Sequence, residues 1–171
     1  MFSILYKLLL TLNATSWMAI IYAIKEKWTI GNLPSCLFGI MLLLIPVLLS
    51  WLSIILSRFL GTESPVMNCK EFNLADGEFL SIYLGYFFVS TGVSEHFTMV
   101  IVYFIVFVFT FLSQTQYYNP IYLLFGYHYY HVLTESGTKI FVIKKGNVIR
   151  NIRDLKFEHL YRLNDTTFIE R

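Results

Sequence analysis

Residues 40–49 read Ile40-Met41-Leu42-Leu43-Leu44-Ile45-Pro46-Val47-Leu48-Leu49, a run without one charged side chain. The run lies inside Trp28–Ser57, which holds no Asp, Glu, Lys or Arg over 30 residues. A helix needs about 20 apolar residues to cross a bilayer core that is about 30 Å thick. The stretch therefore predicts a transmembrane helix, which we place at about 37–56.

Three further segments are free of charged residues: Leu8–Ile24, Phe79–Ser94 and Phe97–Thr134. They predict three more spans, at about 8–24, 79–93 and 97–112, because backbone groups in lipid must be satisfied within the segment. The third span is short, since 15 residues rise about 22 Å as helix. It reaches a normal length only if it begins near Leu74. The polar stretch 57–78 is predicted to be a loop.

The overall composition agrees with a membrane protein. Hydrophobic residues make up 56% of the chain and charged residues 14%, against roughly 25% charged in soluble domains. This excludes a disordered chain, which needs high charge and low hydrophobicity. Two cysteines, Cys36 and Cys69, are too few for a disulfide framework.

The pattern changes from helix to strand after Gly126. Tyr127–Thr134 and Thr138–Lys144 flank the hairpin-length loop Glu135-Ser136-Gly137, and 156–163 and 166–170 flank a turn at Asn164-Asp165. The predicted fold is thus an integral membrane α-helical protein with four transmembrane helices and a small C-terminal cytoplasmic β-rich tail. We divide it into a four-helix transmembrane domain, 1–118, and a tyrosine-rich connector with the β-rich domain, 119–171.

The orientation follows from charge and from the nature of the tail. Four spans place both termini and the 57–78 segment on one side, and a folded tail without disulfides suits the cytoplasm. The expected location is the bacterial inner membrane, multi-pass, with both termini cytoplasmic. The tail carries 8 Lys/Arg against 5 Asp/Glu over 135–171, which is well short of the basic stripe of a dedicated nucleic-acid binder.

No pattern in the chain predicts a catalytic or metal site. No P-loop, HExxH or CxxC motif occurs, and His128 and His131, three apart on a strand, point to opposite faces. No charged residue lies within a predicted span, which argues against a pump or coupled transporter. We predict no enzyme activity, cofactor or metal. Asn13, Thr15 and Ser16 are the one polar cluster in a span, and we interpret them as helix-packing residues.

Two sets of residues are candidates for binding. A basic set in the tail has three interpretations, a solvated sheet face, contact with anionic headgroups or docking of a partner protein: Lys139, Lys144, Lys145, Arg150, Arg153 and Lys156. A second set of amphipathic aromatic residues predicts a belt at the membrane interface: Trp28, Trp51, Tyr117, Tyr118 and Tyr122.

Several stretches together resemble a known family. They are Tyr83-Leu84-Gly85-Tyr86-Phe87-Phe88-Val89-Ser90, Asn119-Pro120, Gly126-Tyr127-His128-Tyr129-Tyr130, Arg162-Leu163-Asn164-Asp165 and Thr167-Phe168-Ile169-Glu170. In this order, after two spans, they resemble KwaA, the membrane subunit of the bacterial Kiwa anti-phage defence system.

The resemblance implies a non-enzymatic inner-membrane sensor and scaffold that detects phage-induced membrane disturbance. It implies a homo-oligomer, a tetramer, which controls or recruits the cytoplasmic DNA-binding effector KwaB and does not itself bind nucleic acid. The alternative hypothesis is a small oligomeric channel or pore, which needs polar residues around a common axis. A membrane enzyme is a third class, for which the sequence offers no convergent set of ionisable groups.

Overall fold

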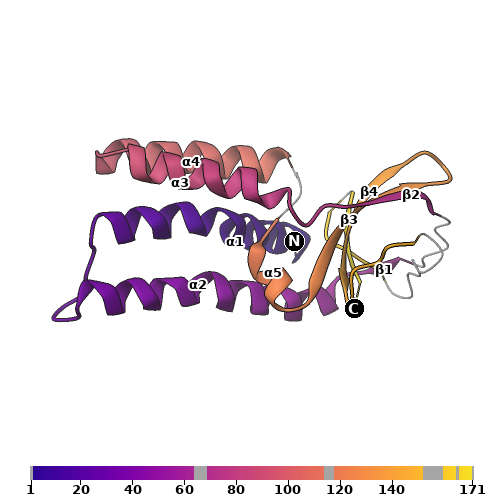
Figure 1. The fold of residues 1–171 in the computed structure, drawn as a ribbon, viewed down its shortest axis with the longest axis horizontal. Helices are drawn as coiled ribbons and strands as arrows, with labels where there is room; N and C mark the ends of the chain where they lie inside the picture. The colour runs from indigo at the N-terminus through magenta and orange to yellow at the C-terminus, as the bar shows by residue number, and fades with distance from the viewer. Residues whose placement is uncertain (1, 64–68, 114–117, 152–159, 165, 171) are drawn as a thin grey trace.

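The computed structural model describes residues 2–63, 69–113, 118–151, 160–164 and 166–170. The helices α1, α2, α3 and α4 lie side by side, and a sheet is joined to one end of them (Figure 1). The helices are α1 Phe2–Lys25, α2 Ser35–Leu56, the 3-10 turn η1 Ser57–Phe59, α3 Phe79–Gly92, α4 His96–Ser113 and the short α5 Pro120–Leu124. The strands are β1 Thr62–Glu63, β2 Cys69–Leu74, β3 Tyr127–Thr134, β4 Lys139–Lys145, β5 Leu160–Arg162 and β6 Thr167–Glu170.

Among the described residues, three helical segments are long and apolar enough to cross a membrane: Ile4–Lys25, Ser35–Phe59 and His96–Ser113. They correspond to the first, second and fourth predicted spans. The third predicted span is α3, an apolar helix of 14 residues, which rises only about 21 Å. A start near Leu74 is wrong, because that residue ends strand β2.

The helices pack around α1. It contacts α2, α3 and α4. Of the three polar residues predicted to pack between helices, Asn13 and Thr15 make bonds to other helices. The Asn13 Nδ2 donates to the Ser50 Oγ on α2 at 3.1 Å, and the Thr15 hydroxyl lies 3.3 Å from that of Tyr103 on α4. The Ser16 hydroxyl instead donates to the carbonyl of Asn13 within α1.

The segment between α2 and α3 differs from its prediction. It was expected to be a loop, but it supplies β1 and β2 to the sheet. Strand β2 reads Cys-Lys-Glu-Phe-Asn-Leu, and its few apolar residues give no clear alternation. Pairing with β3 stabilises it, from Cys69 opposite Thr134 to Leu74 opposite Tyr130. This edge strand depends on its partner more than on its own pattern.

The sheet has six strands in the order β1-β5-β6-β4-β3-β2. The predicted hairpin is confirmed as β3 and β4, with Tyr127 opposite Lys145 and Leu133 opposite Lys139. Strand β6 pairs in parallel with β4 and antiparallel with β5. Because neighbouring side chains on a strand point to opposite faces, β3 places Tyr127 and Tyr129 toward the helices and Tyr130 in a second cluster.

Candidate site coupling the helices to the sheet

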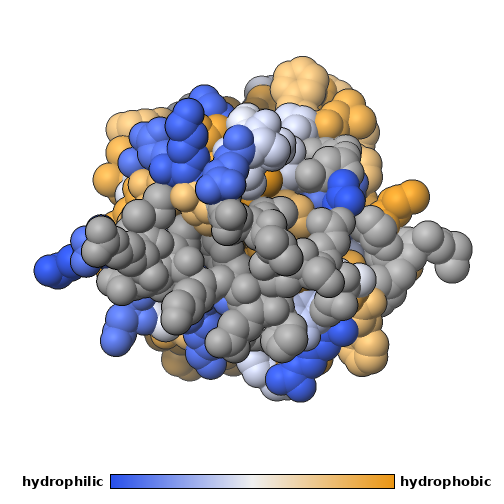
Figure 2. Space-filling view, turned by 90° about the vertical axis from the view of Figure 1, so that its right-hand side faces the viewer, coloured by the Kyte–Doolittle hydropathy of each residue, from blue (hydrophilic) through white to orange (hydrophobic). Residues whose placement is uncertain are grey.

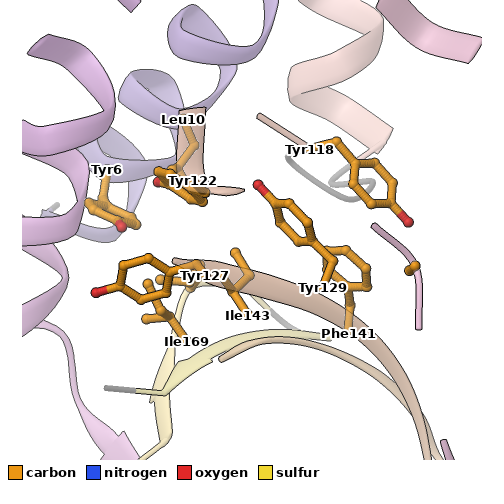
Figure 3. Close-up of a cluster of buried hydrophobic side chains, with 11 residues drawn as sticks. Tyr6, Leu10, Tyr118, Tyr122, Tyr127, Tyr129, Phe141, Ile143 and Ile169 are labelled. Atoms are coloured by element: carbon orange, nitrogen blue, oxygen red, sulfur yellow. The ribbon is translucent and has the colours of Figure 1, made fainter. Parts of the chain in front are cut away.

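The ends of the helices and one face of the sheet share a single hydrophobic core (Figure 3). Tyr6 and Leu10 come from α1, Tyr122 from α5, and Tyr129 from β3. Further members of this coupling core are Tyr118, Tyr127, Phe141, Ile143 and Ile169. The rings of Tyr129 and Phe141 stack with centroids 5.6 Å apart. Packed interiors contain few voids and transmit strain, so this shared core connects the helices to the sheet.

A buried polar network runs through the same region. Asn119 is only 2% exposed, and its Nδ2 donates to the Ser50 Oγ on α2 at 2.8 Å. Its Oδ1 accepts from the backbone N–H of Ile121 at 2.9 Å, which caps α5. The Tyr129 hydroxyl on β3 donates to the Asn119 carbonyl at 2.8 Å. Asn119 therefore connects three elements, and Asn13 adds α1 through Ser50.

Two tyrosine hydroxyls complete the connection to α2. The Tyr122 hydroxyl lies 2.6 Å from the Ser53 Oγ, and the Tyr6 hydroxyl donates to the Ser53 carbonyl at 3.0 Å. Ser53 is fully buried. These bonds satisfy polar groups that would otherwise be costly to bury, and they fix α1, α2 and α5 relative to one another.

The turn before α3 is held to β3 by two carboxylates. The Asp76 Oδ2 lies 2.6 Å from the His128 Nδ1, and its Oδ1 accepts from the backbone N–H of Tyr129 at 2.7 Å. Two residues on, Glu78 accepts from the Tyr118 hydroxyl and lies 3.0 Å from the His131 Nε2. The short helix α3 is thus tied at its start to the sheet.

The electrostatics of this turn favour a charged Glu78 and neutral tyrosines. Burial alone raises the pKa of Glu78, but the hydrogen bonds from Tyr118 and His131 outweigh it and hold the pKa below its usual range. Burial, together with the bonded Glu78 carboxylate, raises the pKa of Tyr118. Burial also raises the pKa of Tyr129 well above its ordinary value. Both phenols therefore stay protonated and act as stable donors.

The basic set does not form one patch. Lys144 pairs with Glu170 and is partly buried, and the Lys145 Nζ lies 5.9 Å from the ring centre of Tyr127. Lys139 is exposed at the opposite end of β4. Arg150, in the segment after β4, is also exposed. Hydrophilic side chains visible at the sheet end lie in separate groups (Figure 2). Arg153 and Lys156 lie outside the described residues.

The aromatic belt divides into two groups. Trp28, after α1, and Trp51, near the end of α2, are 50% and 57% exposed, as residues at an interface would be. Tyr118 and Tyr122, expected among headgroups, are instead 3% and 1% exposed. Their hydroxyls find protein partners, so these side chains face the coupling core rather than lipid. Tyr117 lies outside the described residues.

The most connected residues of the site were not singled out from the sequence. Asn119 entered only as part of the Asn119-Pro120 stretch of the family resemblance, and Ser50 and Ser53 were not considered. The serines have a recognisable signal: they stand three apart in an otherwise apolar helix, and a hydroxyl in that position is expected to find a partner. Within the described ranges, no group of three His, Cys, Asp or Glu side chains is placed to hold a metal.

Together these features are consistent with a membrane protein. In the part of the chain that the structure describes, three helices are long and apolar enough to cross a membrane, and a common core joins α1 and α2 to a six-stranded sheet at one end. The chain belongs to the family described as anti-phage protein KwaA, which matches residues 6–169. No curated protein and no solved structure matches it. Family membership gives the chain a role in defence against phage.

Proposed function

We propose that the chain is a membrane-embedded sensor and scaffold in an anti-phage defence system. It detects phage-induced disturbance of the bacterial inner membrane and recruits or controls the cytoplasmic DNA-binding effector KwaB. Four helices cross the membrane, both termini lie in the cytoplasm, and the chain works without catalysis as a homo-oligomer. Membership of the KwaA family supports the defence role. The resemblance described above is the basis for the effector and for a tetramer.

The observation that carries the proposal is the coupling core. Tyr6 and Leu10 on α1 pack in the same cluster as Tyr129 on β3. Ser50 and Ser53 on α2 bond to residues 119–122. A change in how α1 and α2 pack therefore requires the sheet to shift or the core to repack. Packed interfaces of this kind favour a few discrete arrangements over continuous deformation, which suits a sensor.

The short helix α3 supplies a means of detection. Its 14 residues rise about 21 Å, about 9 Å less than the hydrocarbon core. Mismatch costs fractions of a kcal/mol per Å, so local thinning changes the energy of α3 by up to a few kcal/mol. That range biases a two-state equilibrium tenfold or more. Because Asp76 and Glu78 tie the start of α3 to β3, a movement of α3 reaches the sheet.

The pore hypothesis has less support. Its polar candidates are Asn13, Thr15 and Ser16. Asn13 and Thr15 are engaged by Ser50 and Tyr103 within the same chain, and the Ser16 hydroxyl donates to the Asn13 carbonyl. A conducting pore would have to break these bonds or use other groups. Loss of membrane potential on expression of the full chain without its effector would favour the pore over the sensor.

Substitution of Asn119 tests the coupling. We expect Asn119→Ala to insert in the membrane and to co-purify with KwaB in detergent, but to protect cells poorly in a plaque assay. Its Ser50 and Ile121 bonds are lost, which weakens the connection between α2 and α5 and leaves the Ser53–Tyr122 bond. The matched control is Asn147→Ala, at an exposed position after β4, which should protect like wild type.

Full protection by an Asn119→Ala chain present at wild-type level would overturn the coupling proposal. Should this chain fail to accumulate, Tyr122→Phe provides the milder test, because it removes only the hydroxyl that contacts Ser53. Failure of wild-type protein to co-purify with KwaB would overturn the scaffold role instead.

A further inference from the structure

A long apolar groove of about 640 Å³ lies between α1 and α2. On α1 it is lined at Leu12, Ser16, Ala19, Ile20 and Ala23, and on α2 at Phe38, Leu42, Ile45 and Leu49. Each set follows the three- and four-residue spacing of one helix face. Two apolar faces therefore lie opposite each other along the helices, with α4 contributing only Tyr103.

The two polar side chains on the helices that line the groove, Ser16 and Tyr103, already have partners. The Ser16 hydroxyl donates to the Asn13 carbonyl at 2.8 Å, and the Tyr103 hydroxyl lies 3.3 Å from that of Thr15. No donor or acceptor on these two residues requires a polar ligand or a buried water. Occupation by a hydrocarbon is favoured, since an unfilled apolar void forfeits contacts on its lining.

The length of the groove matches one leaflet of a bilayer. From Leu12 to Ala23 on α1, and from Phe38 to Leu49 on α2, the helices rise about 16 Å. One leaflet contributes about half of the roughly 30 Å hydrocarbon core. A helix from a second copy would span the full thickness, whereas a single acyl chain ends near the midplane.

The groove opens where headgroups are expected. Trp28, Thr29 and Ile30 of the α1–α2 loop line its outer end, and Trp28 is half exposed. Lys27, beside it, is exposed and provides a positive charge for a phosphate. We propose that the groove binds one acyl chain of an anionic phospholipid from the leaflet at the α1–α2 loop, with its phosphate near Lys27.

Photo-labelling tests the site. The full chain is reconstituted in vesicles of phosphatidylethanolamine and phosphatidylglycerol, a trace of the latter carrying a diazirine on its acyl chain. We expect labelled peptides to concentrate on the groove faces of α1 and α2. Ala19→Trp, which fills the groove, should reduce this labelling to the level of the outer surface of α4. Thr91→Trp, an exposed position on α3, is the matched control and should label like wild type.

The headgroup is tested separately. Lys27→Gln should reduce the preference for the phosphatidylglycerol probe over a phosphatidylcholine probe about fivefold, the effect expected of one basic residue near an anionic surface. A second measurement needs no groove-filling variant: a photo-reactive residue at Leu42, in the groove, is compared with one at Leu48, which is 62% exposed. The groove position should capture lipid at much higher yield.

Three results would overturn the proposal: equal labelling of wild type and Ala19→Trp, equal lipid capture at Leu42 and Leu48, or cross-links at Leu42 that join two copies of the chain. The last result would identify a second copy as the occupant. Unchanged headgroup preference in Lys27→Gln would overturn the assignment of the phosphate to that lysine.

Discussion

The ionised carboxylate of Glu78 forms hydrogen bonds that stabilise the folded protein. Its carboxylate accepts from Tyr118, at the start of the described connector, and contacts His131 on β3. These bonds favour the ionised form and lower its pKa below the ordinary 4.5. The charged Glu78 therefore stabilises the folded protein. Its contribution is fully present above about pH 4.5 and is lost as the pH falls through the lowered pKa of the folded state.

We predict that Glu78→Gln weakens this acid dependence. The wild-type protein in detergent should show a falling unfolding temperature as the pH is lowered below 4.5, and the variant should show a smaller fall over the same interval. At neutral pH the variant should unfold at lower temperature than wild type. Glu71→Gln, at an exposed position on β2, is the control. Parallel pH curves for wild type and Glu78→Gln would contradict the prediction.

Asn119 shows how far a single residue can be interpreted from sequence. The Asn-Pro pair predicts a turn, and the structure has the related feature of an N-cap followed by proline at the first helical position. Its bond to Ser50 joins residues 69 apart. No local rule predicts that pairing, because it depends on how α2 and α5 pack in three dimensions.

At the scale of elements, strands β3 and β4 could be predicted from the local sequence, whereas strand β2 could not. The hairpin could be predicted because two strands rich in aromatic and β-branched residues flank a short Glu-Ser-Gly turn, and these signals act locally. Strand β2 could not, because it is a mostly exposed edge strand that is stabilised by β3. The helices of spanning length followed directly from charge-free runs.

The short α3 provides a prediction at this scale. Two leucines inserted within Phe79–Gly92 lengthen the helix by about 3 Å and reduce its mismatch with the bilayer. We expect lower sensitivity to infection in a plaque assay, with unchanged expression, because a better-matched helix responds less to thinning.

Register is the confounding variable, since two extra residues also rotate one part of α3 relative to the other. Two alanines inserted in the α1–α2 loop, outside any helix, control for chain length. Reconstitution of wild-type protein in bilayers of shorter acyl chains controls for rotation. A thinner bilayer should reduce the mismatch of α3 as the inserted leucines do, without changing the helix register. An unchanged response to leucine insertion would place detection in the outer loops or an oligomer interface.

At the scale of the whole molecule, the exposed basic residues indicate where an effector could dock. Lys139 and Lys145 lie at opposite ends of β4, and Arg150 lies in the segment that follows it. We predict that substitution of one of these residues by Glu weakens co-purification with KwaB only if that residue lies at the docking surface. The expected loss of binding free energy is about 0.2–1 kcal/mol for each exposed ion pair lost. Lys27→Glu, at the far end of the helices, should have no effect.

Point substitutions are preferable here to removal of residues 135–171. That deletion eliminates β4 and β6, including Phe141, Ile143 and Ile169 of the coupling core, so loss of binding would not separate docking from unfolding. Wild-type yields of KwaB with all three reversals combined would exclude the basic residues as a docking surface and direct attention to the β1–β2 segment.

The arrangement of the helices leads to a prediction of topology. The start of α1, the end of α2 and the sheet lie at the same end of the helices, and the α1–α2 loop lies at the other (Figure 1). If four helices cross the membrane, both termini share one side, which we expect to be the cytoplasm. Alkaline phosphatase fused after Arg171 should then be inactive, and a fluorescent protein fused there should be bright. Phosphatase inserted at Gly31, in the α1–α2 loop, should be active. Active phosphatase at both Arg171 and Gly31 would contradict this topology and the sheet itself, because an odd number of spans would place β2 and β3, which pair with each other, on opposite sides of the membrane.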